Sequence, residues 1–248
     1  MALTRNHVVL ILLLAAAAVF SVCWAFAVRK RLGLKLPALV GLALLNVALN
    51  LLFVRLFASL EKGKWGVNQG RRIYGSMLFM PLVLFAEAKL TKQEPAEFTD
   101  CFTLLQIIHL ALGRVYCFHT GCCYGKLIPG TALRWPTREL ELFFYAAVFV
   151  WFALRRRRGK TPGLCCPLFL ISYGLFRFGL EFLRYEPMPR SFRLALLWSL
   201  IAVVAGVCLL SEVLHRRAEK PPKGERSARS ARSPRSARSP RGARGTKR

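Results

Sequence analysis

The chain has 248 residues, 54% of them hydrophobic, and its mean hydropathy of +0.37 argues against an ordinary soluble domain. Its apolar segments are longer than a soluble core helix needs, so the sequence predicts an all-α integral membrane protein with one membrane domain. The net charge of +26 is carried mainly by loops and by residues 215–248, which excludes a highly charged core.

Seven apolar segments come close to the roughly 20 residues that a helix needs to cross a bilayer. They are Val8–Val28, Leu36–Leu60, Ile73–Leu90, Phe102–Phe118, Leu140–Leu154, Leu164–Leu183 and Phe192–Leu214. The third to fifth segments are short and two of them end in polar motifs, which is typical of helices that stop at a cavity. We therefore expect about seven transmembrane helices with a polar site at the outer interface of the membrane.

The charges predict the orientation and the domain boundary. Lys and Arg favour the cytoplasmic side, and the Arg155–Lys160 run with the basic tail favours an outer N-terminus and a cytoplasmic C-terminus. In the tail, an arginine recurs at every third position from 226 to 244 among Ser, Ala, Pro and Gly. We expect a membrane domain over 1–214 and a disordered tail over 215–248. The tail composition favours attraction to anionic lipid or plain solvation over nucleic-acid binding.

The densest group of chemically active residues ends the fourth segment, between Gly113 and Gly125. Arg114 lies in an apolar segment, where an arginine is costly unless it meets a partner or an anionic ligand, so it marks a functional site. Gly121 and Gly125 are expected where the helix ends and where the backbone can approach a ligand closely.

The sixth segment carries a second polar group on one helix face. Tyr173, Arg177, Glu181 and Arg184 are spaced so that all four side chains point the same way. The predicted topology brings this face to the same depth as Arg114 and as Tyr74 of the third segment. A surplus of guanidinium groups suits a phosphate, and a phospholipid head group is the available ligand. The alternative is an Arg–Glu network that only holds helices together.

A metal or redox site is the competing interpretation of Cys117, His119, Cys122 and Cys123. Zinc takes four tetrahedral ligands, and adjacent cysteines seldom both reach one ion, so we expect no metal and no other cofactor here. Cys165–Cys166 begin the sixth segment on the opposite side, roughly 30 Å of hydrocarbon away, and are expected neither to complete a metal site nor to form a disulfide with the first group.

Two motifs resemble a known family. Gly113-Arg114 with Phe118, Gly121 and Gly125 matches the family fairly well, and Tyr-Gly-x-x-Arg-Phe-x-x-Glu-Phe-x-Arg over 173–184 is matched throughout. With seven segments in this order, the chain resembles bacterial prolipoprotein diacylglyceryl transferases over roughly residues 8–214. The resemblance implies an enzyme of the bacterial cytoplasmic (inner) membrane. It would move diacylglyceryl from phosphatidylglycerol to the lipobox cysteine thiol of a prolipoprotein, in lipoprotein biosynthesis.

The resemblance also implies roles for individual residues. Arg114 and Arg177 would bind and orient the phosphate, and Glu181 and Arg184 would complete the network. Pro136 and Glu141 resemble the family's Pro-Ser-Gln-Leu-Tyr-Glu segment, although Arg138 and Glu139 depart from it.

Three departures concern the acid–base half of the site. Tyr74-Gly75-Ser76 stands where the family has His-Gly-Gly, Tyr116-Cys117 where it has Gly-Asn, and Gly121-Cys122 where it has Gly-Glu. Tyr74 is therefore the candidate hydrogen-bonding partner or base, His119 is an alternative base, and Cys122 is a candidate substrate-binding residue. The competing hypothesis is a catalytically silent phospholipid-binding protein of the same fold.

Overall fold

The computed structural model describes residues 5–63, 73–157, 162–185 and 189–219, and within these ranges the chain is almost entirely helical. The described helices are α1 (Arg5–Leu32), α2 (Leu36–Lys62), α3 (Ile73–Leu90), α4 (Pro95–Thr120), α5 (Thr137–Arg157), α6 (Cys165–Glu181) and α7 (Pro189–Ala218). This confirms the predicted all-α class and the seven-helix order. The basic tail lies almost wholly outside the described residues, and so does most of the loop between α2 and α3.

Several helices are longer than their apolar segments. α4 begins at Pro95 and not at Phe102, because a helix continues through polar residues that hydropathy does not detect. Proline suits this start, since the first turn of a helix leaves its N–H groups unpaired in any case. α4 ends at Gly121, whose left-handed backbone (φ 64°) caps the helix as the sequence predicts.

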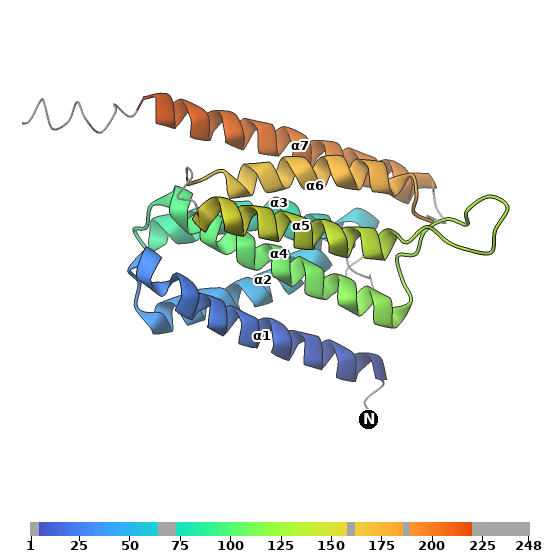
Figure 1. Ribbon diagram of the computed structural model, residues 1–248, viewed down its shortest axis with the longest axis horizontal. Helices are drawn as coiled ribbons and strands as arrows, with labels where there is room; N and C mark the ends of the chain where they lie inside the picture. Colours follow the sequence, from blue (N-terminus) through green and yellow to red (C-terminus); the bar gives the residue numbers. More distant parts are fainter. Residues whose placement is uncertain (1–4, 64–72, 158–161, 186–188, 220–248) are drawn as a thin grey trace, which may run out of the picture. The chain divides into compact units, whose positions relative to one another are not determined.

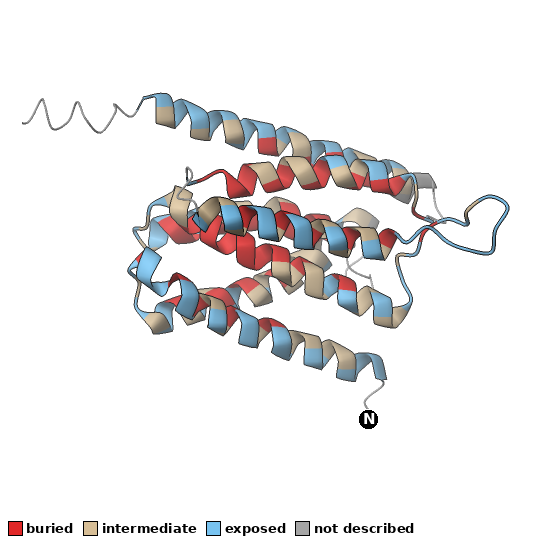
Figure 2. Ribbon diagram, viewed as in Figure 1, coloured by how far each residue is buried: buried red, intermediate tan, exposed pale blue. Residues whose placement is uncertain are grey.

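Burial along the helices shows that this is a multi-pass membrane protein. Among the residues that the structure describes, five helices (α1, α2, α3, α4 and α7) are long and apolar enough to cross a bilayer. In α1 only 17% of the most apolar window is buried, and large side chains such as Leu12 and Val19 are exposed. In α4 the share is 50%, and Figure 2 shows buried residues concentrated along it. Exposed apolar surface on the outer helices is what a lipid solvent requires.

α4 organises the bundle, since it packs against α1, α2, α3, α5 and α6. Figure 1 shows α4 between α1 on one side and α5 and α6 on the other. A cluster of buried side chains fills the space among α3, α4, α5 and α6, and it includes Met77, Leu104, Tyr145, Phe169 and Tyr173. α4 is therefore the helix against which these five helices pack.

The two ends of α4 carry different polar groups. At its start, the Asp100 carboxylate accepts hydrogen bonds from the backbone N–H of Gly163 (2.7 Å) and of Cys165 (2.8 Å), which caps the beginning of α6. Cys117 lies 17 residues further along α4, about 25 Å away at 1.5 Å rise per residue. Cys165 is therefore too distant to join Cys117 in a metal site or a disulfide, as the sequence predicts.

Candidate functional site

A buried ion network joins α4, α5 and α6. Glu141 of α5 accepts two guanidinium groups on one carboxylate oxygen, Arg114 Nη2 at 2.7 Å and Arg177 Nη1 at 2.9 Å. The Tyr173 hydroxyl lies 3.4 Å from the same oxygen. All four side chains are buried, so each charge depends on these partners. Glu141 is thus the residue on which the two predicted phosphate-binding arginines converge.

Glu181 extends the network along α6, as the spacing predicts. Its Oε2 lies 2.9 Å from Arg177 Nη2 and 3.5 Å from Arg184 Nη1. Three guanidinium groups and two carboxylates therefore meet in one network. The Nε of Arg114 is buried and has no hydrogen-bond partner among the described residues. A buried donor without a partner is costly, which favours an anionic or oxygen-rich ligand beside it.

Tyr74 links the network to α7. Its hydroxyl lies 3.0 Å from the Ala195 carbonyl, to which it donates, and 3.0 Å from Ser199 Oγ. It also accepts a hydrogen bond from Arg177 Nε at 3.3 Å. Of the two predicted roles for Tyr74, this geometry matches the hydrogen-bonding partner, because the phenol proton is directed at a carbonyl and the oxygen at a cation. Ser199 and Ala195 carry no pattern that identifies them in the sequence.

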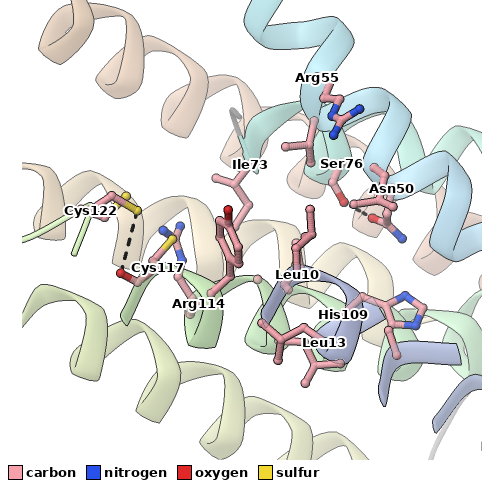
Figure 3. Close-up of a pocket in the computed structure, with 18 of the residues that line it drawn as sticks. Leu10, Leu13, Asn50, Arg55, Ile73, Ser76, His109, Arg114, Cys117 and Cys122 are labelled. Atoms are coloured by element: carbon pink, nitrogen blue, oxygen red, sulfur yellow. Dashed lines mark hydrogen bonds between the residues drawn. The ribbon is translucent and has the colours of Figure 1, made fainter. Parts of the chain in front are cut away.

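Tyr74 and the three arginines of the ion network line a cavity of about 610 Å³. Its polar lining includes Tyr74, Arg114, Arg177 and Arg184, together with Arg55 and His109. Its apolar lining comes largely from α1 and α2: Leu10, Leu13, Leu14, Ala17, Val47, Leu51 and Val54. Figure 3 shows Arg114, Cys117 and Cys122 on one side of the cavity, and Leu10, Leu13 and His109 on the other. The cavity thus combines a cationic wall with a mainly apolar lining from α1 and α2, in which Arg55 and Asn50 are polar exceptions.

A second polar cluster lies deeper in the same cavity. Asn50 and Gln106 exchange two side-chain hydrogen bonds of 2.6 Å each, and Ser76 bonds to both of them. Asn50 and Ser76 line the cavity, and Gln106, which is not part of the lining, is buried. Each amide and hydroxyl of this trio has a protein partner, so the cluster fastens α2, α3 and α4 together where they surround the cavity. The sequence does not single out Gln106, because a lone glutamine in an apolar helix has no distinctive spacing.

The loop after α4 is fastened to the segment after α6. Lys126 N–H donates to the Leu183 carbonyl (2.8 Å), and Tyr185 N–H donates to the Tyr124 carbonyl (3.2 Å). Between these bonds Gly125 pairs with Arg184 in an isolated β-bridge. This pairing holds the loop beside the residues that end the ion network.

Gly121 and Gly125 have different roles. Gly121 ends α4 and reverses the chain toward the cavity. At Gly125 a Cβ atom would collide with the backbone of Trp135. The close approach that the structure shows at Gly125 is therefore that of the Trp135 backbone, and an approach to a ligand stays a prediction.

Three cysteine thiols converge at the same edge of the cavity. The Sγ atoms of Cys117, Cys122 and Cys123 all lie within 4.8 Å of one another, and all three residues line the cavity. Hydrogen bonds from the Cys117 and Cys122 thiols lower the pKa of Cys123, and the charges of Arg114 and Arg177 lower it further. The sequence-based argument that adjacent cysteines seldom both reach one ion does not hold for this geometry, since Cys122 and Cys123 both approach Cys117, Cys123 with a left-handed backbone (φ 60°).

His119 does not belong to this group. It is absent from the residues that line the cavity and from the cysteine cluster. Two positions beyond Cys117, it points to a different face of α4. The geometry therefore gives no support to His119 as a base for chemistry in the cavity.

Fold and site together define a multi-pass α-helical membrane protein with a buried guanidinium–carboxylate network on the wall of a half-apolar cavity. The sequence model of the prolipoprotein diacylglyceryl transferases matches residues 65–211. That is more than half of the chain, and the chain belongs to this family. The match includes all five residues of the ion network and Tyr74.

Individual relatives are distant. The chain is similar to proteins named phosphatidylglycerol–prolipoprotein diacylglyceryl transferase from Chlorobaculum tepidum (29% identity over 134 residues, 49% of this chain and 46% of the relative) and Sinorhizobium medicae (28% over 154 residues, 56% and 55%). The corresponding protein of Clostridium tetani is 25% identical over 138 residues (49% and 54%). The chain thus spans about half the length of the curated relatives it matches.

Proposed function

We propose that the protein is a transferase that moves the diacylglyceryl group of phosphatidylglycerol onto the cysteine thiol of a prolipoprotein lipobox. The observation that supports this proposal is that Arg114, Arg177 and Arg184 line a cavity that is otherwise largely apolar. The family to which the chain belongs supports it as well. A phospholipid needs both features, since its phosphate is anionic and its acyl chains are apolar. The named activity of the relatives supports the choice of lipid and acceptor.

The arginines suit a phosphate better than lysines would. Each guanidinium presents donors in a planar fork that matches two phosphate oxygens, and Glu141 holds the forks of Arg114 and Arg177 in fixed positions. The buried Arg114 Nε, which has no hydrogen-bond partner among the described residues, leaves a donor for one anion. Charge that develops on a leaving phosphate would be stabilised by donors already in place, and such preorganised stabilisation supplies most of the rate enhancement in many enzymes.

The apolar wall suits the lipid chains. Leucines and valines of α1 and α2 face the cavity, and its volume of about 610 Å³ falls within the usual range of small-molecule sites, roughly 300–1,000 Å³. A lipid with its head group at Arg114 would direct its chains toward these two helices. Binding energy from the chains would then hold the reacting carbon near the network.

The proposed reaction is a displacement at carbon. The acceptor thiol loses its proton to solvent, and the thiolate attacks the glycerol carbon that carries the phosphate ester. A carbon–sulfur bond forms, the carbon–oxygen bond breaks with its electrons going to the phosphate oxygen, and glycerol phosphate leaves. Arg114 and Arg177 would hold the leaving phosphate, and Tyr74 would act by orienting Arg177.

The same site suits a second candidate, a phospholipid-binding protein without turnover. The observation that favours it is the Tyr74 hydroxyl, whose proton is directed at the Ala195 carbonyl and whose oxygen already accepts from Arg177, so it is poorly placed to take a thiol proton. Purified protein mixed with phosphatidylglycerol and a lipobox peptide separates the two candidates. Peptide-dependent release of glycerol phosphate supports the transferase, whereas lipid that stays bound and intact supports the silent protein.

We also propose that the basic tail, residues 215–248, is dispensable for this activity. The residues that form the cavity and the ion network all lie between Leu10 and Ser199. Deletion of residues 219–248 is expected to leave membrane insertion and glycerol phosphate release unchanged. Loss of release in an inserted truncated protein would show that the tail takes part.

A further inference from the structure

The three-cysteine cluster is not explained by phosphate binding. Cys117, Cys122 and Cys123 lie beside Arg114 on the cavity wall but form no ion pair with the network. Their sulfur atoms come from two different elements, the last turn of α4 and the loop that follows it. Three thiols within 4.8 Å of one another, facing a cavity, are a set of soft metal ligands.

The backbone builds this cluster. Gly121 ends α4 in the left-handed conformation, and Cys123 is left-handed two residues later, so the chain folds back over Cys117. The Cys123 carbonyl is held by Thr137 Oγ1 at 3.0 Å, and the Cys122 sulfur accepts a hydrogen bond from Thr120 Oγ1 at 3.2 Å. Figure 3 shows Cys122 turned toward Cys117, where its thiol also lies 3.9 Å from the Cys117 carbonyl.

We propose that Cys117, Cys122 and Cys123 bind one zinc ion whose fourth position faces the cavity and takes the thiol of the acceptor peptide. Catalytic zinc sites have three protein ligands and one open position, whereas structural sites have four. Tetrahedral zinc with Zn–S bonds of about 2.3 Å places its sulfurs about 3.8 Å apart. The cysteine sulfurs already lie within 4.8 Å of one another, so small side-chain movements complete the geometry.

This inference rests on the proposed function and adds to it a way of ionising the acceptor. A thiol that coordinates zinc is deprotonated. The ion would therefore deprotonate the acceptor thiol, a role for which Tyr74 and His119 are poorly placed. The thiol proton passes to solvent when the acceptor binds. The zinc-bound thiolate then forms the carbon–sulfur bond while the carbon–oxygen bond breaks, and the phosphate leaves with the second negative charge.

Zinc content tests the ligands. The full chain, purified in detergent under reducing conditions, is incubated with zinc chloride, desalted and measured for metal and for free thiols. We expect about one zinc per chain, and roughly tenfold or greater loss of affinity in C117S, C122S and C123S, since even indirect partners of a metal often contribute that much. C23S and C208S change exposed cysteines outside the cluster and serve as matched controls. A zinc content near zero, or a disulfide within the cluster, overturns the proposal.

Cobalt tests the open position without lipid turnover. The cobalt-loaded protein is expected to show sulfur-to-cobalt charge-transfer absorption, and a lipobox peptide should shift this spectrum when it carries cysteine but not when serine replaces that cysteine. An unchanged spectrum with the cysteine peptide overturns the acceptor role. A shift without lipid transfer refutes the proposed function and leaves the thiol site standing. Transfer by zinc-free protein, undiminished in C117S, refutes the zinc site and leaves the proposed function standing.

Discussion

Glu141 Oε1 lies 2.7 Å from Arg114 Nη2, and this pair, buried on both sides, joins α5 to α4 at the wall of the cavity. Because Arg177 of α6 uses the same carboxylate oxygen, one glutamate fixes the positions of two arginines from different helices. The phosphate-binding geometry therefore depends on a residue that itself need not touch the phosphate.

E141Q should destabilise the protein and weaken lipid binding together. The substitution keeps the shape of the side chain but leaves two buried guanidinium groups without their shared counter-charge, which costs about 3–5 kcal/mol for a broken buried pair. Thermal unfolding in detergent and phosphatidylglycerol binding measure the two effects. E139Q is the matched control, since Glu139 lies two residues earlier in α5 and its side chain is 47% exposed. Equal stability of the two variants would contradict the role given to Glu141.

R114K and R177K should insert into the membrane but lose about 100-fold in turnover. Lysine keeps the charge yet lacks the planar fork, and removal of one donor that stabilises a developing anion commonly costs about 10²–10³-fold. Transfer rates of the inserted variants measure this. R29K, which alters an exposed arginine at the end of α1, should behave like the wild type. The phosphate assignment fails if both cavity variants turn over lipid at the normal rate.

Y74F tests whether Tyr74 positions Arg177 or removes a proton. Phenylalanine keeps the ring but loses the hydrogen bonds to Ala195, Ser199 and Arg177. We expect a modest fall in turnover, roughly tenfold or less, with an unchanged pH profile, because no titrating group is removed from the reaction. Loss of about 10²–10⁴-fold together with an altered pH profile would instead identify Tyr74 as the base.

The orientation of the chain is also open to a direct test. The excess of Lys and Arg in the Arg155–Lys160 run and the tail predicts an outer N-terminus and a cytoplasmic C-terminus. Reporter fusions at Gly125 and at Lys220 should therefore report the outer and the cytoplasmic side, respectively. A reporter at Lys220 that is active only outside would invert the topology and place the cavity at the cytoplasmic interface.

Part of this site is visible in the sequence because it follows helix periodicity. Arg177 and Glu181 are four residues apart on one helix, and the structure pairs them at 2.9 Å as that spacing predicts. The family resemblance points to Glu141, but its partners do not follow from spacing. A glutamate near the start of an amphipathic helix is usually exposed, and only the packing of α4, α5 and α6 buries Glu141.

The cysteine cluster shows a different limit. In most backbone conformations the side chains of two adjacent residues point in different directions. Sequence spacing alone therefore does not predict that Cys122 and Cys123 approach the same point. Cys123 adopts a left-handed backbone conformation, which is uncommon for a residue other than glycine. Nothing in the sequence predicts it. The start of α4 escapes prediction for a simpler reason, since hydropathy detects the apolar part of this helix but not its polar first turn.

Mass spectrometry of the acceptor peptide tests the central claim most directly. Purified protein is incubated with phosphatidylglycerol and a lipobox peptide, with a serine-for-cysteine peptide as the control. The account predicts a cysteine peptide heavier by one diacylglyceryl group, through a thioether that withstands hydroxylamine, and an unmodified serine peptide. Unmodified cysteine peptide in the presence of bound, intact phosphatidylglycerol would contradict the account.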